Sequence, residues 1–473
     1  MRYDSAVPTY HVENFGCRAT QADGAELERQ FESRGLVPSS AAQADLVILN
    51  TCTVTNSADQ DARAAIRRVQ RQNPLAKIIV TGCYAQRAPE EITALPGVTA
   101  VIGNSHKHQL AEIVLTNICH PPVSRAERSA FVPLTRLSGN AHIFISDIFA
   151  HTELLAAPVF ESTTHESGRT RPNLKVQDGC DNRCSFCIIP SVRGQSRSLP
   201  LSQVIREMSA LVAAGYREVV ISGINLGHWG RDLDSVESRQ PDFEQLLRAI
   251  LSATQLEKLR ISSVEPMDWT DEVIALAASS PRIAKHAHLP LQSGSDAVLR
   301  RMHRKYRPWH YREKIEKIRA AMPTAAIGAD VMAGFPGETD AEFEATRRFV
   351  ADLPFTYLHV FTYSARPGTP AAAMPNQVPL DVARERNKIL RDLAAEKKLA
   401  FMRSFIGKSL PAITLNVMRN NSHGECTEAL TDNYQRLYLK GRHEPNRWIR
   451  AQVAAEQDGV FMADPFPEAS QQK

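Results

Sequence analysis

The sequence has no long hydrophobic run, no apolar leader and no strong excess of charge. No stretch approaches the roughly 18 consecutive apolar residues of a membrane-spanning helix. No apolar segment follows Met1-Arg-Tyr-Asp as it would in a secretory signal. The net charge of +4 over 473 residues is too small to indicate nucleic-acid binding by itself. We therefore expect a cytoplasmic globular protein that does not associate with a membrane.

No acid–base pair or nucleophilic triad is evident either. Eight cysteines are present, and in a reducing compartment they are better explained by metal binding than by disulfides. The length corresponds to about three domains, each able to bury a core of its own. The cysteines are therefore the first candidates for the chemistry of this chain.

Three cysteines lie in one short loop, Gly179-Cys-Asp-Asn-Arg-Cys-Ser-Phe-Cys, with the spacing C-x3-C-x2-C formed by Cys180, Cys184 and Cys187. Three thiolates can bind three irons of a [4Fe–4S] cluster and leave the fourth iron open to a substrate, whereas electron-transfer clusters are closed by four cysteines. A zinc knuckle is the alternative, but zinc needs a fourth Cys or His nearby. The nearest downstream histidine is His228. The loop therefore favours a radical enzyme.

A second set of cysteines is defined by position rather than by spacing. Cys17, Cys52 and Cys83 each come within two residues of the end of a predicted strand. The carboxyl ends of parallel strands share one edge of a sheet, where open α/β sheets bind ligands. The three thiols are therefore expected to converge as the ligands of a second cluster, although isolated buried cysteines are also common in cores. The remaining two, Cys119 and Cys426, have no such setting.

The pattern of apolar residues predicts an α/β protein of three parts. Short strands alternate with helices in the first part, which indicates a Rossmann-like parallel sheet; a capping box at Ser57 and Gln60 starts its second helix. Six further strand–helix units suit a partial (βα)6 barrel, with the cysteine loop after its first strand. Short alternating runs at the end of the chain predict a small β-barrel. The expected boundaries are 8–118 for the first domain, 119–170 for a linker with one strand at 142–149, 171–400 for the partial barrel and 403–466 for the C-terminal barrel.

With two three-cysteine sets in this order, the chain resembles the radical S-adenosylmethionine methylthiotransferases over nearly its whole length. The resemblance implies an N-terminal methylthiotransferase domain, a radical S-adenosylmethionine barrel and a C-terminal TRAM domain. The TRAM likeness is carried by Glu428-Ala-Leu-Thr-Asp-Asn-Tyr434 and Gly441. Four phrases resemble the branch that acts on threonylcarbamoyladenosine of tRNA: Asn50-Thr-Cys-Thr-Val-Thr-Asn56, Gly168-Arg-Thr-Arg-Pro-Asn-Leu-Lys-Val-Gln-Asp-Gly179, Gly223-Ile-Asn-Leu-Gly227 and Ser262-Ser-Val-Glu-Pro266.

The resemblance also implies cofactors and roles. Cys180, Cys184 and Cys187 would bind a [4Fe–4S] cluster that cleaves S-adenosylmethionine to a 5′-deoxyadenosyl radical, with an external electron donor. Cys17, Cys52 and Cys83 would bind a second [4Fe–4S] cluster that holds or supplies the sulfur. A second S-adenosylmethionine would provide the methyl group, and the methylthio group would enter at C2 of the adenine. The expected cofactor contacts are Phe186 on the adenine, and Asn225, Gln292 and Ser293 on the ribose and methionine.

The partner implied is the anticodon loop of tRNA. The stretch from Arg300 to Arg319 holds nine Lys or Arg against two Glu, interleaved with Tyr306, Trp309 and Tyr311, and suits a single-stranded loop. Arg63, Arg67 and Arg71 share one helix face and are a second candidate RNA contact. Both the basic stretch and this helix face could instead be solvated surfaces. Three alternatives stay open: the isopentenyladenosine branch, a branch that modifies a ribosomal-protein side chain, and a cluster-containing RNA-binding protein without radical activity. The oligomeric state is not indicated.

Overall fold

The computed structural model describes residues 7–119, 141–150, 154, 170–234, 240–421 and 424–466. The N-terminal part is a parallel sheet of six strands in the order β2-β1-β3-β4-β5-β6. Its central strands are buried because they read as continuous apolar runs such as Leu46-Val-Ile-Leu. The strands are β1 (Thr9–Asn14), β2 (Val37–Pro38), β3 (Leu46–Thr51), β4 (Lys77–Gly82), β5 (Val98–Gly103) and β6 (His142–Phe144).

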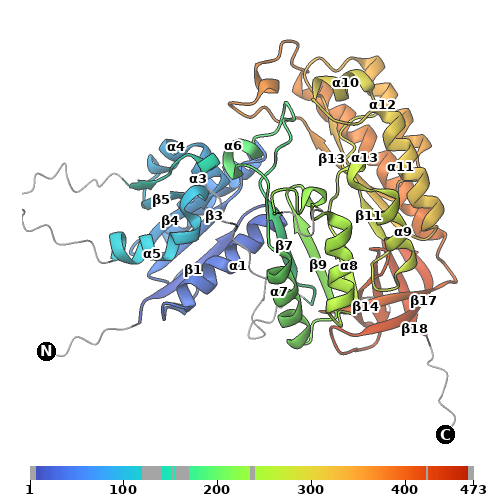
Figure 1. Cartoon of the computed structure of the whole chain (residues 1–473), viewed down its shortest axis with the longest axis horizontal. Helices are drawn as coiled ribbons and strands as arrows, with labels where there is room; N and C mark the ends of the chain where they lie inside the picture. Colours follow the sequence, from blue (N-terminus) through green and yellow to red (C-terminus); the bar gives the residue numbers. More distant parts are fainter. Residues whose placement is uncertain are drawn as a thin grey trace, which may run out of the picture.

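Helices lie on both faces of this sheet, as the alternating pattern predicted (Figure 1). They are α1 (Arg18–Glu32), α2 (Asn56–Gln72), α3 (Cys83–Arg87), α4 (Pro89–Thr93), η1 (Asn104–Gln109), α5 (Leu110–Ile113) and η2 (Val114–Cys119). The predicted capping box of α2 was wrong by two residues. The Thr55 side chain accepts the hydrogen bond from the Ala58 amide, so the helix begins before Ser57.

The middle of the chain forms an open half-barrel of parallel strands. Two sheets, β10-β9-β7-β8 and β11-β12-β13, are joined by isolated parallel bridges, among them Ser263 to His288. No strand pairing within the described residues closes β13 onto β7. The strands are β7 (Asn173–Asp178), β8 (Arg197–Ser198), β9 (Glu218–Gly223), β10 (Lys258–Ile261), β11 (His286–His288), β12 (Ala326–Ala333) and β13 (Tyr357–Thr362).

Helices cover the outside of the half-barrel and pack on the alternate, apolar residues of each strand, such as Leu174 and Val176 of β7. The capping box of Thr339 and Glu342 is confirmed, since both of its hydrogen bonds form. The helices are η4 (Ile148–Ala150), α6 (Ile189–Arg193), α7 (Leu201–Ala213), η5 (Leu226–His228), α8 (Phe243–Ala253), η6 (Pro266–Asp268), α9 (Asp271–Ser279), α10 (Asp296–Arg301), α11 (Pro308–Ala321), α12 (Asp340–Asp352), η7 (Pro370–Ala373) and α13 (Leu380–Arg403).

The chain ends in a closed five-stranded barrel in the order β14-β15-β16-β18-β17. It lies below the half-barrel in Figure 1, at the amino ends of strands such as β9 and β11. The buried Arg260 of β10 joins the two parts, because its guanidinium donates to the carbonyl of Asp432 at 3.1 Å while pairing with Glu218. The strands are β14 (Ser409–Asn421), β15 (Gly424–Thr431), β16 (Arg436–Lys440), β17 (Trp448–Gln457) and β18 (Val460–Pro465).

The N-terminal domain contacts both edges of the open half-barrel. On the β7 side, the Asn173 side chain donates to the carbonyl of Arg18 at 3.2 Å. On the β13 side, the buried Arg366 donates to Thr53 at 2.8 Å and also pairs with Asp59 of α2. The domain therefore spans the side of the half-barrel where β13 and β7 do not pair (Figure 1).

The strand predicted within the linker is not free-standing. β6 pairs in parallel with β5, at Ala100 with His142 and at Ile102 with Phe144, so this part of 119–170 extends the N-terminal sheet. Most of the rest of the predicted linker lies outside the described residues, and the domain boundaries stay predictions. In the part of the chain that the structure describes, no helix is long and apolar enough to cross a membrane.

Candidate active site

The loop with Cys180, Cys184 and Cys187 leaves β7 at its carboxyl end through a sharp turn. Gly179 has φ +72°, and an added Cβ would lie 1.8 Å from the carbonyl oxygen of Gln195. Backbone hydrogen bonds pin the loop on both sides, from Cys180 N to Gly194 O at 3.1 Å and from Ser185 N to Met302 O at 3.1 Å. The half-barrel therefore presents the three thiols on a tightly held loop.

The three thiols of this loop are free and suit a cluster better than a single metal ion. No group of three or more His, Cys, Asp or Glu side chains among the described residues could hold a metal ion. A four-iron cluster makes a different demand, because each thiolate binds its own iron and the sulfurs need only surround a shared space. Burial raises the pKa of Cys180 to about 11 and that of Cys187 to about 12, so metal must displace protons to bind there.

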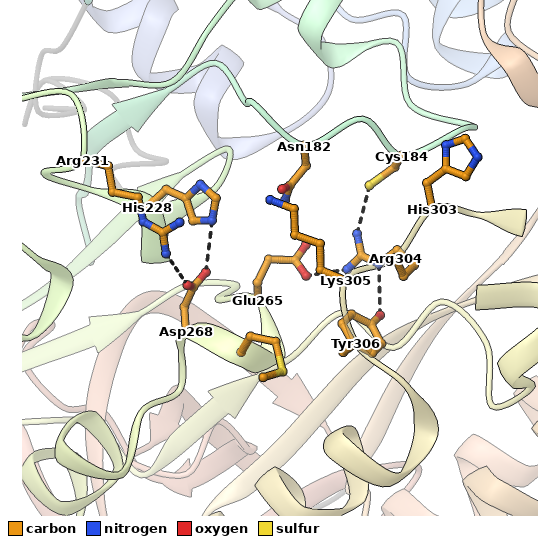
Figure 2. Close-up of a pocket in the computed structure, with 11 residues that line it drawn as sticks. Asn182, Cys184, His228, Arg231, Glu265, Asp268, His303, Arg304, Lys305 and Tyr306 are labelled. Carbon is orange, nitrogen blue, oxygen red and sulfur yellow. Dashed lines mark hydrogen bonds and ion pairs between the residues drawn. The ribbon is translucent and has the colours of Figure 1, made fainter. Parts of the chain in front are cut away.

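A cavity of about 130 Å³ opens beside Cys184 (Figure 2). The Arg304 guanidinium donates to Cys184 Sγ at 3.2 Å and to Glu265 Oε2 at 2.5 Å. On the opposite wall, Asp268 accepts from Arg231 at 2.8 Å and lies 3.7 Å from the His228 ring. Burial lowers the pKa of His228 to about 4, with Arg231 acting in the same direction. The cavity therefore offers cations, a neutral imidazole and carboxylates to a zwitterionic ligand next to the cysteine loop.

The second cysteine set converges as predicted, because β1, β3 and β4 are adjacent strands. Cys52 and Cys83 directly follow β3 and β4, whereas Cys17 lies three residues beyond β1 and directly precedes α1. An added Cβ at Gly16 would lie 2.9 Å from Cys52 Sγ, which places the Cys17 turn against Cys52. Burial, together with the neighbouring Cys83 and Cys17, raises the pKa of Cys52 to about 12. All three thiols are free and fit a second cluster.

The two cysteine sets lie close together across the domain interface. Cys83 packs in one apolar cluster with Ile188 and Val192, and Ile188 directly follows Cys187. The Asn104 amide donates both to Cys83 Sγ at 3.5 Å and to the carbonyl of Val192 at 2.7 Å. One layer of side chains therefore separates the second set from the loop that carries the first.

A buried network of charges, which the sequence analysis missed, holds this interface. Asp23 of α1 pairs with Lys107 at 3.0 Å, with Arg193 at 3.0 Å, and with Lys175. Lys175 and Arg193 also pair with Asp178, at 2.8 and 2.9 Å. Burial alone would raise the pKa of Asp23, but the three cations outweigh it and lower the pKa to about 2.

The network has three cations against two carboxylates, and Arg193 is close enough to Cys83 and Cys17 to interact with their charge. Its excess positive charge therefore favours thiolates in the second set. The sequence signal for this network is the alternation of polar and apolar residues in Asn-Leu-Lys-Val-Gln-Asp. The structure buries this strand at every position, so its charged residues need partners inside the protein.

Family models and relatives agree with this architecture. Residues 174–350 match the Radical SAM superfamily, and residues 9–103 match a family described as Uncharacterized protein family UPF0004. The chain is 36% identical over 441 residues to the Bacillus subtilis protein named threonylcarbamoyladenosine tRNA methylthiotransferase MtaB, covering 93% of this chain and 91% of that protein. The chain belongs to the radical S-adenosylmethionine methylthiotransferase family. Membership implies S-adenosylmethionine and a [4Fe–4S] cluster as cofactors of this methylthiotransferase.

A second relative of this methylthiotransferase has a different substrate in its name. The Novosphingobium aromaticivorans protein named tRNA-2-methylthio-N(6)-dimethylallyladenosine synthase is 35% identical, covering 89% of both chains. Among solved structures, the methyltransferase TsrM from Kitasatospora setae matches with a TM-score of 0.52 at 15% identity, over 81% of this chain and 84% of that one. This likeness shows the fold alone.

The four predicted cofactor contacts of the methylthiotransferase lie around the carboxyl ends of the strands. Asn225 Nδ2 lies 3.8 Å from Cys180 Sγ, and its buried Oδ1 has no hydrogen-bond partner among the described residues. Phe186 packs edge-on to Phe335 with ring centroids 6.5 Å apart. Gln292 has φ +64°. Ser293 is buried, and its hydroxyl lies 3.0 Å from that of Thr346. Their contacts with the cofactor stay predictions.

Stacking of RNA bases on the aromatic residues of the basic stretch was in large part a wrong prediction. Tyr306 and Tyr311 are 1% and 0% exposed and belong to the core, whereas Trp309 is 56% exposed. The cations of this stretch are also engaged, for example Arg301 with Glu342 at 2.7 Å and Lys317 with Asp271 at 2.9 Å. Tyr311 falls on the buried face of α11 with Ile315 and Ile318. Tyr306 precedes this helix and is buried with its hydroxyl on the carbonyls of Pro290 and Leu291.

Replacement of Gly179 by alanine should reduce the iron bound at the first set. The new Cβ would collide with a backbone carbonyl in a left-handed turn that cannot yield without moving Cys180. Gly215→Ala is a matched control, because Gly215 has φ +91° but no neighbour within 4 Å of the added Cβ; it should cost only about 1 kcal/mol of stability. Iron per chain after anaerobic reconstitution measures the difference. Equal iron in both variants would contradict the proposed role of the turn.

Proposed function

We propose that this protein methylthiolates C2 of threonylcarbamoyladenosine next to the anticodon in tRNA. The reaction would use two molecules of S-adenosylmethionine and two [4Fe–4S] clusters, with an external electron donor. The observation that carries the proposal is the packing of Cys83 against Ile188 and Val192, which brings the second cysteine set beside the loop that carries Cys187. A base inserted there could meet both a radical source and a sulfur source.

The cysteines would divide the work between the two sites. Cys180, Cys184 and Cys187 would hold the cluster that binds S-adenosylmethionine, and Cys17, Cys52 and Cys83 would hold the second cluster. When bound, these cofactors supply the radical hydrogen abstraction at C2 of the adenine and the sulfur and methyl group that enter there.

Other side chains would orient these groups. Arg304 donates to Cys184 Sγ, and Asn104 donates to Cys83 Sγ. Hydrogen bonds to the ligand sulfurs are one of the means by which a protein adjusts the potential of a cluster. The cavity lined by His228, Arg231 and Asp268 lies next to the loop and is the proposed place for the polar part of S-adenosylmethionine.

The RNA contacts would lie on exposed parts of the surface. Trp309 is the exposed aromatic residue of the predicted basic stretch, and Arg67 and Arg71 are exposed on α2. Base stacking on an exposed aromatic ring suits a single-stranded loop. The target base must leave its stack to reach the cysteine sets.

Mass spectrometry of nucleosides from tRNA tests the substrate. Cells that lack the gene should lose the 2-methylthio derivative of threonylcarbamoyladenosine and accumulate the unmethylthiolated form, and restoring the gene should reverse both changes. If the 2-methylthio derivative of dimethylallyladenosine is lost instead, the substrate would be the one in the name of the Novosphingobium relative. Unchanged tRNA nucleosides together with a modified ribosomal protein would overturn the tRNA assignment.

A further inference from the structure

The interior of the half-barrel is lined by polar side chains. In each strand the residues that pack on the outer helices are apolar, such as Val219 and Ile221 of β9, so the alternate residues point inward. Along β10 to β13 these inward positions include Arg260, His288, Asp330 and His359. Toward the amino ends of the strands the charges are paired, since Arg260 pairs with Glu218 at 2.7 Å. Toward the carboxyl ends of β9 and β11, the interior has polar atoms without hydrogen-bond partners among the residues described.

On this inner wall, one ring nitrogen of His288 lacks a hydrogen bond to the part of the chain that the structure describes. It is 7% exposed, and its Nδ1 lies 2.5 Å from the Ser263 hydroxyl. Its Nε2 lies 3.3 Å from Asp330 Oδ1 but makes no hydrogen bond within the described residues. The Ser222 hydroxyl of β9 is buried and equally without a partner. A buried polar atom without a partner costs about 1–3 kcal/mol, so such groups in an interior indicate a ligand that completes them.

Arg18 brings a positive charge to this wall from the N-terminal domain. It follows Cys17, is half-buried, and its guanidinium makes no hydrogen bond or ion pair to the residues described. Burial lowers the pKa of His286 and of His359, and the charge of Arg18 contributes in the same direction to both. The His359 side chain is exposed, and its ring lies 5.6 Å from that of His288. The His359 ring therefore lies beside that of His288, and Arg18 is near enough to His286 and His359 for its charge to act on both.

The chemistry of this space distinguishes two substrates that relatives carry in their names. A dimethylallyl group is a hydrocarbon and would leave the unpartnered polar atoms desolvated and unsatisfied. A threonylcarbamoyl group carries a carboxylate, a hydroxyl and a urea-like linkage, which together can bind a guanidinium and several hydrogen-bonding side chains. A site built to hydrogen-bond one substituent rejects an analogue that lacks it.

We propose that Arg18, His288 and His359 form the pocket that binds the acidic substituent on the target adenosine, with Arg18 on its carboxylate and His288 Nε2 on its uncharged polar groups. This inference rests on the proposed function and adds the residues that select the substrate. The base would then be held beside Cys17 by contacts that only an acidic, hydrogen-bonding substituent can make.

Binding of three RNAs to the iron-reconstituted full chain tests the pocket. Anticodon stem-loops carry threonylcarbamoyladenosine, dimethylallyladenosine or plain adenosine at the same position, and fluorescence anisotropy gives their dissociation constants. The wild-type protein should bind the first about tenfold or more tightly than the others, as expected for hydrogen bonds to a charged group. Arg18→Met should remove this preference, and Arg18→Lys should restore part of it because the charge remains. Arg206→Met, at a side chain 68% exposed on α7, is the control and should keep the preference.

Iron content is measured for every variant, because Arg18 adjoins Cys17. His359→Leu lies far from the cysteines in sequence and should weaken the preference severalfold even if Arg18→Met loses iron. A wild-type preference that survives both Arg18→Met and His359→Leu would overturn the pocket while leaving the proposed function intact. Methylthio product without any wild-type binding preference would also overturn it. If no product forms on the threonylcarbamoyl stem-loop, the proposed function itself fails.

Discussion

Replacement of Cys17 by alanine should abolish the methylthio product while reductive cleavage of S-adenosylmethionine continues. The reason is the division between the two cysteine sets: Cys17 lies on the N-terminal sheet with Cys52 and Cys83, whereas the loop after β7 carries the other three thiols. Iron per chain should fall from about eight to about four atoms after anaerobic reconstitution, since an open cluster already has only three protein ligands.

The measurement is chromatography of 5′-deoxyadenosine and of nucleosides from the same reaction. Cys184→Ala should lose both products, because its thiol belongs to the set next to the proposed S-adenosylmethionine cavity. Cys119→Ala is the control; Cys119 ends η2 and belongs to neither set, so both products should persist. Methylthio product from the Cys17→Ala variant would show that the second cluster assignment is wrong.

Replacement of Asp23 by asparagine should destabilise the contact between the N-terminal domain and the half-barrel by about 3–5 kcal/mol, the usual cost of removing one partner from a buried ion pair. Asp23 is 2% exposed and pairs with Lys107, Lys175 and Arg193. Without its charge, Lys175 and Arg193 would share Asp178 alone, and Lys107 would keep, among the described residues, only its hydrogen bond to Asn50. The change should also loosen the second cysteine set, because Arg193 adjoins it.

Hydrogen exchange and urea unfolding measure this effect. Amides of α1 and β7 should exchange faster, and the unfolding midpoint should fall. Asp271→Asn removes a surface pair with Lys317 and should leave both measurements unchanged, because exposed pairs contribute little. An Asp23→Asn protein with wild-type exchange in α1 and β7 would contradict the role of the network in holding the two parts together.

Much of the fold followed from local patterns in the chain. Apolar periodicity and caps predict helices near 202–214, 243–254, 270–278, 308–321 and 340–352, and α7, α8, α9, α11 and α12 lie there because they bury a regular face. The longer strands of the parallel sheets also lie where the apolar runs predict them. Short elements without a regular apolar pattern, such as β2 and α10, were not predicted. The strands β15 and β18 of the last barrel were also missed; β15 has no apolar pattern because it buries polar residues such as Thr427 and Glu428.

The candidate site divides in the same way. The three cysteines of the C-x3-C-x2-C loop are close in sequence, so their spacing alone predicted three thiols in one place. The second set needed only the rule that parallel strands end at one edge. In contrast, Tyr306 and Tyr311 were assigned to RNA on composition. The burial of Tyr311 depends on which face of α11 meets the core, and that of Tyr306 on its contact with the segment after β11.

By itself the sequence determined the family, the two cysteine sets and the α/β order of the first two parts, because these depend on residue spacing along the chain. Only the tertiary structure decided how the sets meet. Asp23 and Lys175 are 152 positions apart, and Arg18 lies far in sequence from His288 and His359. Such pairings arise from the docking of one domain on the open side of another. We propose that the polar interior that results, rather than any sequence motif, distinguishes an acidic substituent from a hydrocarbon one.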